Sequence, residues 1–275
     1  MLPPLLLDGW FVLHQLFRVE PAPAPGGIRS HRADEVAGLF AAWADLGDSG
    51  WSGAYRIVGG GAHLLALHLR PSLEALAEVE SALRPSAAAG ELTLVHDFLS
   101  VVELALYSAT LKVAVEAEKE GVEPGTPAWE SLAQDQREVE RGRAHVQRRL
   151  YPRQPPELPF VNVYPMDRKR EAGANWYRLP LEERESMMAH HGTVGRRYAG
   201  RISQIISGAI GLDDWEWMVT LFARDPLDFK RIITEMRYLE STARYAEFGS
   251  FQTGYRLDME GLKRILMGEA GGTRI

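Results

Sequence analysis

The chain has 275 residues, 45% of them hydrophobic, with a formal net charge of −6 and no cysteine. This length and composition predict a globular protein with one large core or two ordinary ones. The acidic balance excludes an overall attraction to nucleic acid or to an anionic membrane, and the lack of cysteine excludes disulfides, thiolate zinc sites and iron–sulfur clusters.

The first residues, MLPPLLLDGW, contain a short leucine run that no basic residue precedes and that Asp8 ends. This is a poor match to a secretory signal. No run of about 18 apolar residues predicts a membrane span. A cytoplasmic protein without nucleic-acid or membrane partners is therefore expected, and a cysteine-free chain suits a reducing cytosol.

Residues 1–120 predict an N-terminal domain with the order strand, helix, strand, strand, helix, strand. The predicted elements are residues 10–19, 30–46, 53–59, 62–69, 72–83 and 91–107. Ser30 and Ser72 are the predicted N-caps of the two helices. Gly59 to Gly61 predict a tight hairpin turn, because glycine adopts left-handed backbone angles at little cost.

Residues 121–159 predict a connection between two domains. Thr126 and Pro127 are typical of a helix start, and a charge-rich helix is predicted from there to about Arg149. The proline-rich segment YPRQPPELP is expected to end it.

Residues 160–275 predict a C-terminal domain that repeats the first order of elements. The predicted elements are a strand at 160–166, a helix from Pro180 to about Tyr198, strands at 201–210 and 214–223, a helix from Asp225, and a strand at 248–256. Two such split βαβ units predict an α+β fold of two ferredoxin-like halves, whose sheets pack face to face or close into a barrel.

The segment between the first strand and helix of this second domain combines charge with aromatic residues. Arg168 to Arg170 lie between Tyr164 and the pair Trp176-Tyr177, in a stretch expected to be irregular. It suits a solvated connector, and it also suits the wall of a site for a planar anion, because a guanidinium offers paired donors to a carboxylate. Trp176 is expected to be a core anchor or a lid over a flat ring.

His191 shares a mostly apolar helix stripe with Met187, Met188 and Val194. Such a histidine is either a core residue hydrogen-bonded to backbone or an axial ligand of an iron porphyrin. In the second case one ring nitrogen binds the metal and the other donates to an acceptor. The neighbouring His190 is expected at the surface.

Four further residues are candidates for the same site. Tyr164 ends a strand and is either a packing residue or a hydrogen-bond donor, acid or one-electron relay. Gln204 lies in an apolar strand, and it points either into a cavity or away from it. Arg237 and Thr242, both predicted in the helix after Asp225, are either surface residues or part of the same cavity.

The second half resembles the chlorite-dismutase-like heme proteins, most closely their coproheme decarboxylase branch. The resemblance is carried by VYPMDRKR, NWYRLP and HHGTVGRRYAGRISQIISGAIGLDDWEWMVTLFARDPLDFKRIITEMRYLESTARYAEFGSF, and in the first half only by DFLSVVELALY and the order of elements. It implies two ferredoxin-like halves per chain forming a dimeric α/β barrel, heme in the C-terminal half, and a homopentamer.

The resemblance also implies a role for each matched residue. His191 of the HG pair matches the proximal iron ligand and Tyr164 of the YPM motif the redox tyrosine, while Gln204 stands where chlorite-cleaving relatives carry arginine. The other matched pocket or propionate-binding positions are Arg149, Met166, Arg168, Arg196, Arg237 and Thr242. Arg168 replaces a common lysine, Thr242 replaces the usual serine, and the match at Arg149 slips by a residue.

The implied activity is oxidative decarboxylation of iron coproporphyrin III (coproheme) to heme b by hydrogen peroxide, the last step of a bacterial heme pathway. Peroxide oxidises the His191-bound iron, and a Tyr164 radical then takes a hydrogen from a propionate, which loses carbon dioxide and leaves a vinyl group. This happens twice. Coproheme is then both substrate and redox cofactor, and a transient contact with a coproporphyrin ferrochelatase is expected.

Two other functions remain open. A chlorite dismutase shares the fold and the ligand, but it needs a cationic side chain over the iron, where this chain has neutral Gln204. A heme carrier or sensor without turnover would use the same histidine and arginines only for binding.

Overall fold

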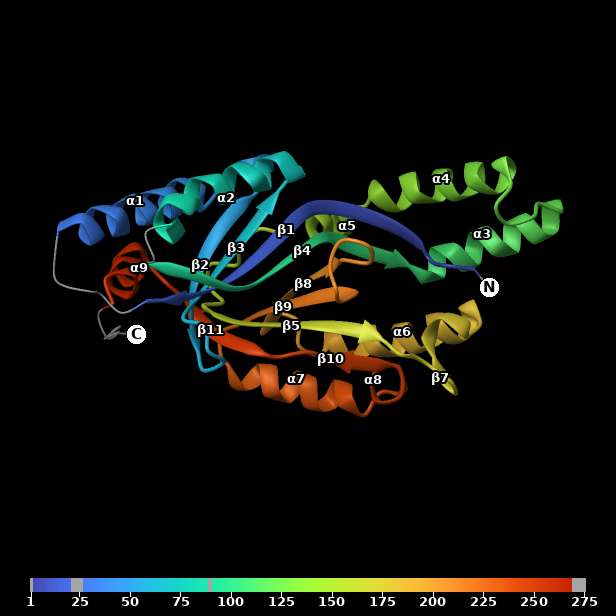
Figure 1. Cartoon of the computed structure of the whole chain (residues 1–275). Coiled ribbons are helices and arrows are strands. Elements are labelled where there is room, and N and C mark those ends of the chain that lie inside the picture. Colours follow the sequence, from blue (N-terminus) through green and yellow to red (C-terminus); the bar gives the residue numbers. More distant parts are fainter. Residues whose placement is uncertain (1, 21–26, 89–90, 269–275) are drawn as a thin grey trace.

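Both halves of the chain build the same order of elements in this computed structural model, which describes residues 2–20, 27–88 and 91–268 (Figure 1). The first half contains β1 (Leu5–Val19), α1 (Gly27–Trp43), the short helix η1 (Gly47–Ser49), β2 (Trp51–Val58), β3 (Leu64–Arg70), α2 (Leu73–Ala88) and β4 (Leu92–Leu106). The second contains β5 (Phe160–Arg168), α6 (Leu181–Arg196), β8 (Ile202–Gly208), β9 (Trp217–Ala223), α7 (Leu227–Arg237) and β11 (Gln252–Arg256).

The strands of both halves join in one antiparallel sheet. Its order is β10-β5-β11-β2-β3-β1-β4-β8-β9, and β5 also pairs with β9, so the pairings form a closed circuit. Within each half the fourth strand lies beside the first, and the second lies beside the third. The short strand β10 (Ala246–Phe248) pairs with the end of β5. The predicted α+β class is confirmed.

Several predicted boundaries are wrong. Ser30 lies inside α1 rather than at its cap, because the helix begins at Gly27. The strand predicted at 248–256 is two strands, β10 and β11. Ser72 does cap α2, since its hydroxyl accepts a hydrogen bond from the Ala75 amide at 3.3 Å. The glycine turn is confirmed, with φ near +80° at Gly59 and Gly61.

The connection between the halves is more helical than predicted. α3 (Tyr107–Glu120) follows β4 directly and was not predicted. The single helix predicted from Pro127 to about Arg149 is two helices, α4 (Pro127–Arg141) and α5 (Ala144–Leu150), separated at Gly142. Thr126 caps α4 as predicted, with its hydroxyl accepting from the Trp129 amide at 3.3 Å.

The basic and aromatic segment is ordered, not irregular. β5 continues through Arg168, and β6 (Arg170–Glu171) pairs with β7 (Ala174–Asn175) in a small hairpin. The short helix η2 (Trp176–Arg178) follows, capped by the Asn175 side chain. The last described helix, α9 (Met259–Leu266), was also missed.

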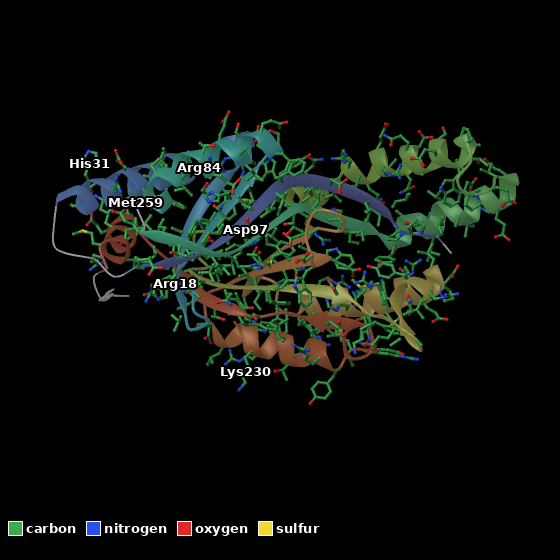
Figure 2. All side chains as sticks on the ribbon, viewed as in Figure 1. Arg18, His31, Arg84, Asp97, Lys230 and Met259 are labelled. Atoms are coloured by element: carbon green, nitrogen blue, oxygen red, sulfur yellow. The ribbon has the colours of Figure 1, made fainter. Side chains whose placement is uncertain are left out.

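Separate hydrophobic cores hold these layers together. One core joins strands of both halves and includes Trp51, Leu67, Phe98, Val161 and Phe222. A second lies beneath α1, α2 and α9, which cover one face of the N-terminal strands (Figure 1). A third lies between the C-terminal strands and α7. The side chains of Arg18, Arg84 and Lys230, labelled in Figure 2, are exposed.

Within the described residues, none of the helices combines the length and hydrophobicity that crossing a bilayer requires.

The free energy of unfolding is expected to fall as the pH is lowered from about 6.5 toward about 3. Burial lowers the pKa of His14 and of His68 from 6.5 to about 3 in the folded protein. The unfolded chain therefore binds these protons first, so the stability present above pH 6.5 is lost as the pH falls. Each histidine contributes a slope of up to about 1.4 kcal/mol per pH unit, measurable by urea unfolding across this window.

The double variant His14→Asn, His68→Asn separates this effect from carboxylate protonation. Its stability should decline less steeply over the same pH range. An unchanged slope would assign acid unfolding to other groups.

Candidate active site

One face of β5 presents three of the candidate residues. Tyr164, Met166 and Arg168 alternate along the strand, so their side chains project to the same side. This side is covered by α6, α7 and the short helix α8 (Glu240–Ala243), which pack against one another. Tyr164 belongs to the apolar cluster formed there, and Met166 packs against it.

Aromatic rings and one arginine surround Tyr164. Its ring stacks on Phe251 with centroids 4.3 Å apart, and Phe248 lies 5.8 Å away. Arg237 places its Cζ atom 4.1 Å from the Phe248 ring. Burial raises the pKa of the Tyr164 phenol well above 10, although Arg237 opposes the rise. The phenol therefore keeps its proton at neutral pH, so it can give up a proton together with an electron.

Arg168 carries a buried positive charge. Its guanidinium donates to the Ser241 carbonyl at 2.5 Å and to the Met188 sulfur at 3.2 Å. Its Cζ atom lies 4.2 Å from the Trp176 ring centroid. In the described part of the chain no carboxylate lies within ion-pair distance of this guanidinium, while Glu216 accepts from the Arg168 backbone N–H at 2.7 Å. Glu216 acts on the guanidinium charge without forming an ion pair with it, so the guanidinium can still bind an anionic ligand.

His191 faces this region from α6. Burial lowers the pKa of its imidazole to about 4, and the positive charge of Arg168 is the second largest cause. The ring is therefore neutral at pH 7, the form that binds metals. Nδ1 is enclosed and has no hydrogen-bond partner among the described residues, so the expected acceptor for the second nitrogen is not found there. Nε2 is the nitrogen left for a metal. His190 is exposed, as predicted.

Trp176 is a core residue with only 2% of its surface exposed. It packs against the Arg168 guanidinium on one side and the Tyr245 ring, at 5.8 Å, on another. This burial favours the anchor interpretation over the lid. The anchor in turn holds Arg168 in place.

Tyr107 is a site residue that sequence reasoning missed. It is the first residue of α3, and its hydroxyl lies near the Trp176 indole and close enough to Arg168 and Arg184 for their charges to act on its pKa. Burial raises its pKa. Tyr107 ends the stretch DFLSVVELALY, so the signal was the one part of the first half that resembles the heme family.

Gln204 shares the sheet face of Tyr164. It pairs with Leu221, which also pairs with Asn162, two residues before Tyr164 on β5. Paired residues project to the same side, so Gln204 faces the helices, and it is exposed there. Asn162, also missed, is buried with an unpartnered Oδ1 atom.

The remaining predicted residues are spread more widely. Arg237 ends α7, whereas Thr242 is buried on the separate helix α8, so the prediction of one helix for both was wrong. Arg196 is exposed at the end of α6 and donates to Thr193 Oγ1 at 2.8 Å. Arg149 lies on α5, which packs on β1 and β4, and no described contact joins it to Tyr164 or His191.

The donor set fits an iron porphyrin better than a bare metal ion. No three His, Cys, Asp or Glu side chains of residues 2–20, 27–88 and 91–268 cluster in a way that could hold a metal. A porphyrin ring supplies the other ligands, so a single neutral imidazole suffices.

The closed antiparallel sheet and the residues on its helix-covered side belong to a chain that matches a known family. Residues 29–257 match the family model described as chlorite dismutase, and the chain belongs to this family. Two relatives, from two strains of Thermus thermophilus, are named coproheme decarboxylase. Each is 40% identical over 269 residues, which cover 96% of both chains.

Solved structures agree with this assignment. A heme-binding protein from Thermus thermophilus superposes with a TM-score of 0.79 at 39% identity, covering 96% of this chain and 97% of the other. A mutant chlorite dismutase from Candidatus Nitrospira defluvii gives a TM-score of 0.69 at 17% identity, covering 95% and 97%. At that identity the second likeness shows a common fold alone.

Proposed function

We propose that this chain is an enzyme that converts coproheme to heme b by hydrogen-peroxide-dependent oxidative decarboxylation. One observation carries the proposal: a neutral His191 lies beside the buried Arg168, which has no carboxylate partner among the described residues, on the side of the sheet to which Tyr164 projects. The 40% identity to relatives named coproheme decarboxylase supports it.

Coproheme suits this region because it is flat and bears four propionates. His191 Nε2 would bind the iron. Arg168 and Arg237 supply positive charge on the Tyr164 side of the sheet, and their planar guanidinium groups match carboxylates. Trp176 and Met188 hold Arg168 from two directions, which reduces the side-chain freedom that binding would otherwise have to remove. Met166 and Gln204 lie on the same sheet face and are proposed pocket residues, together with Thr242 and Arg196.

Each decarboxylation removes two electrons from a propionate. The side chain –CH₂–CH₂–COO⁻, one hydrogen peroxide and one proton become –CH=CH₂, carbon dioxide and two water molecules. The bound iron supplies the oxidising chemistry when peroxide arrives. Tyr164 is proposed to take one hydrogen atom from the propionate side chain as a phenoxyl radical and so to return to the phenol. The second electron would leave the substrate radical for the bound iron as carbon dioxide departs.

The surroundings of Tyr164 suit such a role. Stacking on Phe251 fixes the ring orientation, and the raised pKa keeps the proton on the phenol until an electron leaves with it. The apolar cluster keeps water from the ring, because Tyr164 is only 8% exposed.

Chlorite dismutase activity is the second candidate, since the family carries that name. Gln204, on the face of β8 that the helices cover, is neutral and offers no charge to hold an oxyanion. A heme carrier or sensor would need His191 and the arginines but not the phenol of Tyr164.

We also propose the finer architecture. The strand order of each half is that of a ferredoxin-like unit, with the N-terminal half at 1–120, the connection at 121–159 and the heme-binding half at 160–275. The closed circuit of pairings supports a dimeric α/β barrel within one chain. A cytoplasmic homopentamer that receives coproheme from a ferrochelatase completes the proposal.

Titrating the coproheme-loaded protein with hydrogen peroxide tests the function. Mass spectrometry of the extracted porphyrin should show two successive losses, each of carbon dioxide with two hydrogen atoms. A porphyrin mass that stays constant while peroxide is consumed would contradict the decarboxylation and favour a heme carrier or sensor. Oxygen release from added chlorite at a rate comparable to the decarboxylation would favour chlorite dismutase instead.

A further inference from the structure

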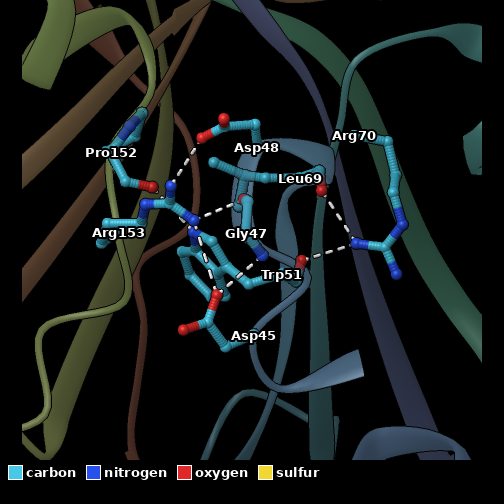
Figure 3. A network of polar contacts seen from close by, with 8 residues as sticks. All are labelled: Asp45, Gly47, Asp48, Trp51, Leu69, Arg70, Pro152 and Arg153. Atoms are coloured by element: carbon cyan, nitrogen blue, oxygen red, sulfur yellow. Dashed lines mark hydrogen bonds and ion pairs between the residues drawn. The ribbon is translucent and has the colours of Figure 1, made fainter. Parts of the chain in front are cut away.

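Arg70 is a second buried arginine, located in the N-terminal half away from the candidate active site. It ends β3, and only 4% of its surface is exposed. Nη1 donates to the backbone carbonyls of Trp51 and Leu69, and Nη2 donates to Ser52 Oγ, each at 2.8 Å. Figure 3 shows one terminal nitrogen of the guanidinium reaching both carbonyls.

No acidic side chain of the described residues balances this charge. Asp45 and Asp48, the acids drawn in the same network, are paired with Arg153 on the other side of Trp51 (Figure 3). All three acceptors of Arg70 are uncharged, and among the described residues no carboxylate lies within ion-pair distance of it. A buried cation without a counter-charge is costly, unless an anion from outside the chain supplies one.

The guanidinium retains a pair of unused donors. It has five N–H groups, and three have partners in the described structure. The two that remain are Nε–H and one Nη2–H, and Figure 3 shows Nε and Nη2 on the side of the guanidinium away from the two carbonyls. This edge of a guanidinium can donate to two oxygens of one carboxylate. Nε of Arg184 is enclosed without a partner, whereas Nε of Arg70 is not completely enclosed, so it retains some contact with solvent.

Neighbouring side chains pack around the guanidinium and orient it. Ser52 Oγ, which accepts from Arg70, also bonds His68 Nδ1 at 2.8 Å. His68 is fully buried, and its Nε2 atom has no partner among the described residues. The Trp43 ring lies 5.9 Å from the Arg70 Cζ atom and 6.0 Å from the His68 ring, so one indole covers both.

The second half gives a comparison. Arg224 follows β9 and precedes α7, just as Arg70 ends β3 and precedes α2. Arg224 is exposed, whereas Arg70 is buried under Trp43. The topology of a half therefore does not require a buried arginine at this place, and the burial of Arg70 is a feature of the N-terminal half.

We propose that Arg70, oriented by Ser52 and by the His68 ring bonded to Ser52, binds a small carboxylate in the N-terminal half. The single positive charge suits a monoanion, the side-by-side donors suit two oxygens in one plane, and the Trp43 indole provides a flat neighbour. This site does not depend on the proposed function of the C-terminal half.

The test uses the full chain without porphyrin and sodium acetate as the probe, at constant ionic strength. A saturable rise in the unfolding midpoint is expected, reaching roughly 5 °C when acetate is about 100 times its Kd. Chloride at the same ionic strength should give less than a fifth of this rise. Line broadening of ¹³C-labelled acetate by the protein provides a second measurement that needs no unfolding.

Three variants assign the site. Arg70→Gln should abolish both responses. Ser52→Ala, which keeps the guanidinium, should weaken acetate binding several-fold, and it remains informative if Arg70→Gln does not fold. Arg224→Gln is the matched control and should respond like the parent chain. The proposal is overturned by a parent chain without a saturable response, by an equal response to chloride, or by an unchanged response in Ser52→Ala and Arg70→Gln.

Discussion

Tyr164→Phe is expected to bind coproheme with an affinity within about threefold of the parent chain and to lose decarboxylation by roughly 1,000-fold. The substitution removes only the hydroxyl. The ring keeps its stacking on Phe251 and its place in the apolar cluster, so the fold and the pocket should persist. Without the phenolic O–H, the side chain can no longer exchange a hydrogen atom with a propionate.

The measurement combines an absorbance titration of binding with mass spectrometry of the porphyrin after peroxide addition. Tyr198→Phe is a matched control, because Tyr198 is buried in the same cluster and donates its hydroxyl to Glu235 at 2.6 Å. That variant should keep its activity. Full turnover by Tyr164→Phe would show that the reaction does not need the Tyr164 hydroxyl. The proposed roles of the porphyrin-binding residues would still stand.

His191→Ala should weaken coproheme binding by roughly 100-fold and change the ferric absorption spectrum. The imidazole is neutral at pH 7 because burial and Arg168 lower its pKa to about 4, so the parent chain presents an unprotonated nitrogen to iron. The methyl group of alanine offers no ligand. The porphyrin-free protein should lose little stability, since the enclosed Nδ1 atom makes no hydrogen bond in the described structure.

His190→Ala is the control for this experiment. His190 is the adjacent residue on α6 and is exposed, so its removal should leave the ferric spectrum unchanged. Spectra and electron paramagnetic resonance of the ferric complexes, recorded with thermal unfolding of the porphyrin-free chains, separate ligation from folding. An unchanged spectrum in His191→Ala, or a changed one in His190→Ala, would place the iron ligand elsewhere.

Some missed elements had readable signals in the sequence. The stretch YSATLKVAVEAEKE of α3 is rich in helix formers, but no break separates it from the apolar strand before it. α9 is preceded by Asp258, whose side chain caps it by accepting from the Gly261 amide at 2.6 Å. A cap followed by an amphipathic run is a helix start that was overlooked.

The burial of the Arg168 side chain could not be predicted from the local sequence pattern. A strand was predicted to end at Met166, because three successive basic residues read as a solvated segment. The side chain is instead buried by groups distant along the chain, namely the Ser241 carbonyl and the Met188 sulfur. Arg70 is similar, because nothing in its neighbours HLRPS distinguishes it from the exposed Arg224 in FARDP.

The sequence by itself determined the α+β class, the repeated order of strands and helices, and the candidate identities of His191, Tyr164 and Gln204. Periodicity, caps and glycine turns act over a few residues, and short motifs keep their spacing along the chain. Only the tertiary structure decided which charges are buried and which lack a counter-charge, because burial depends on what packs across a helix or strand from elsewhere. That is why the burial of Arg168, and the candidate roles of Tyr107 and Arg70, emerged from the fold and not from the sequence.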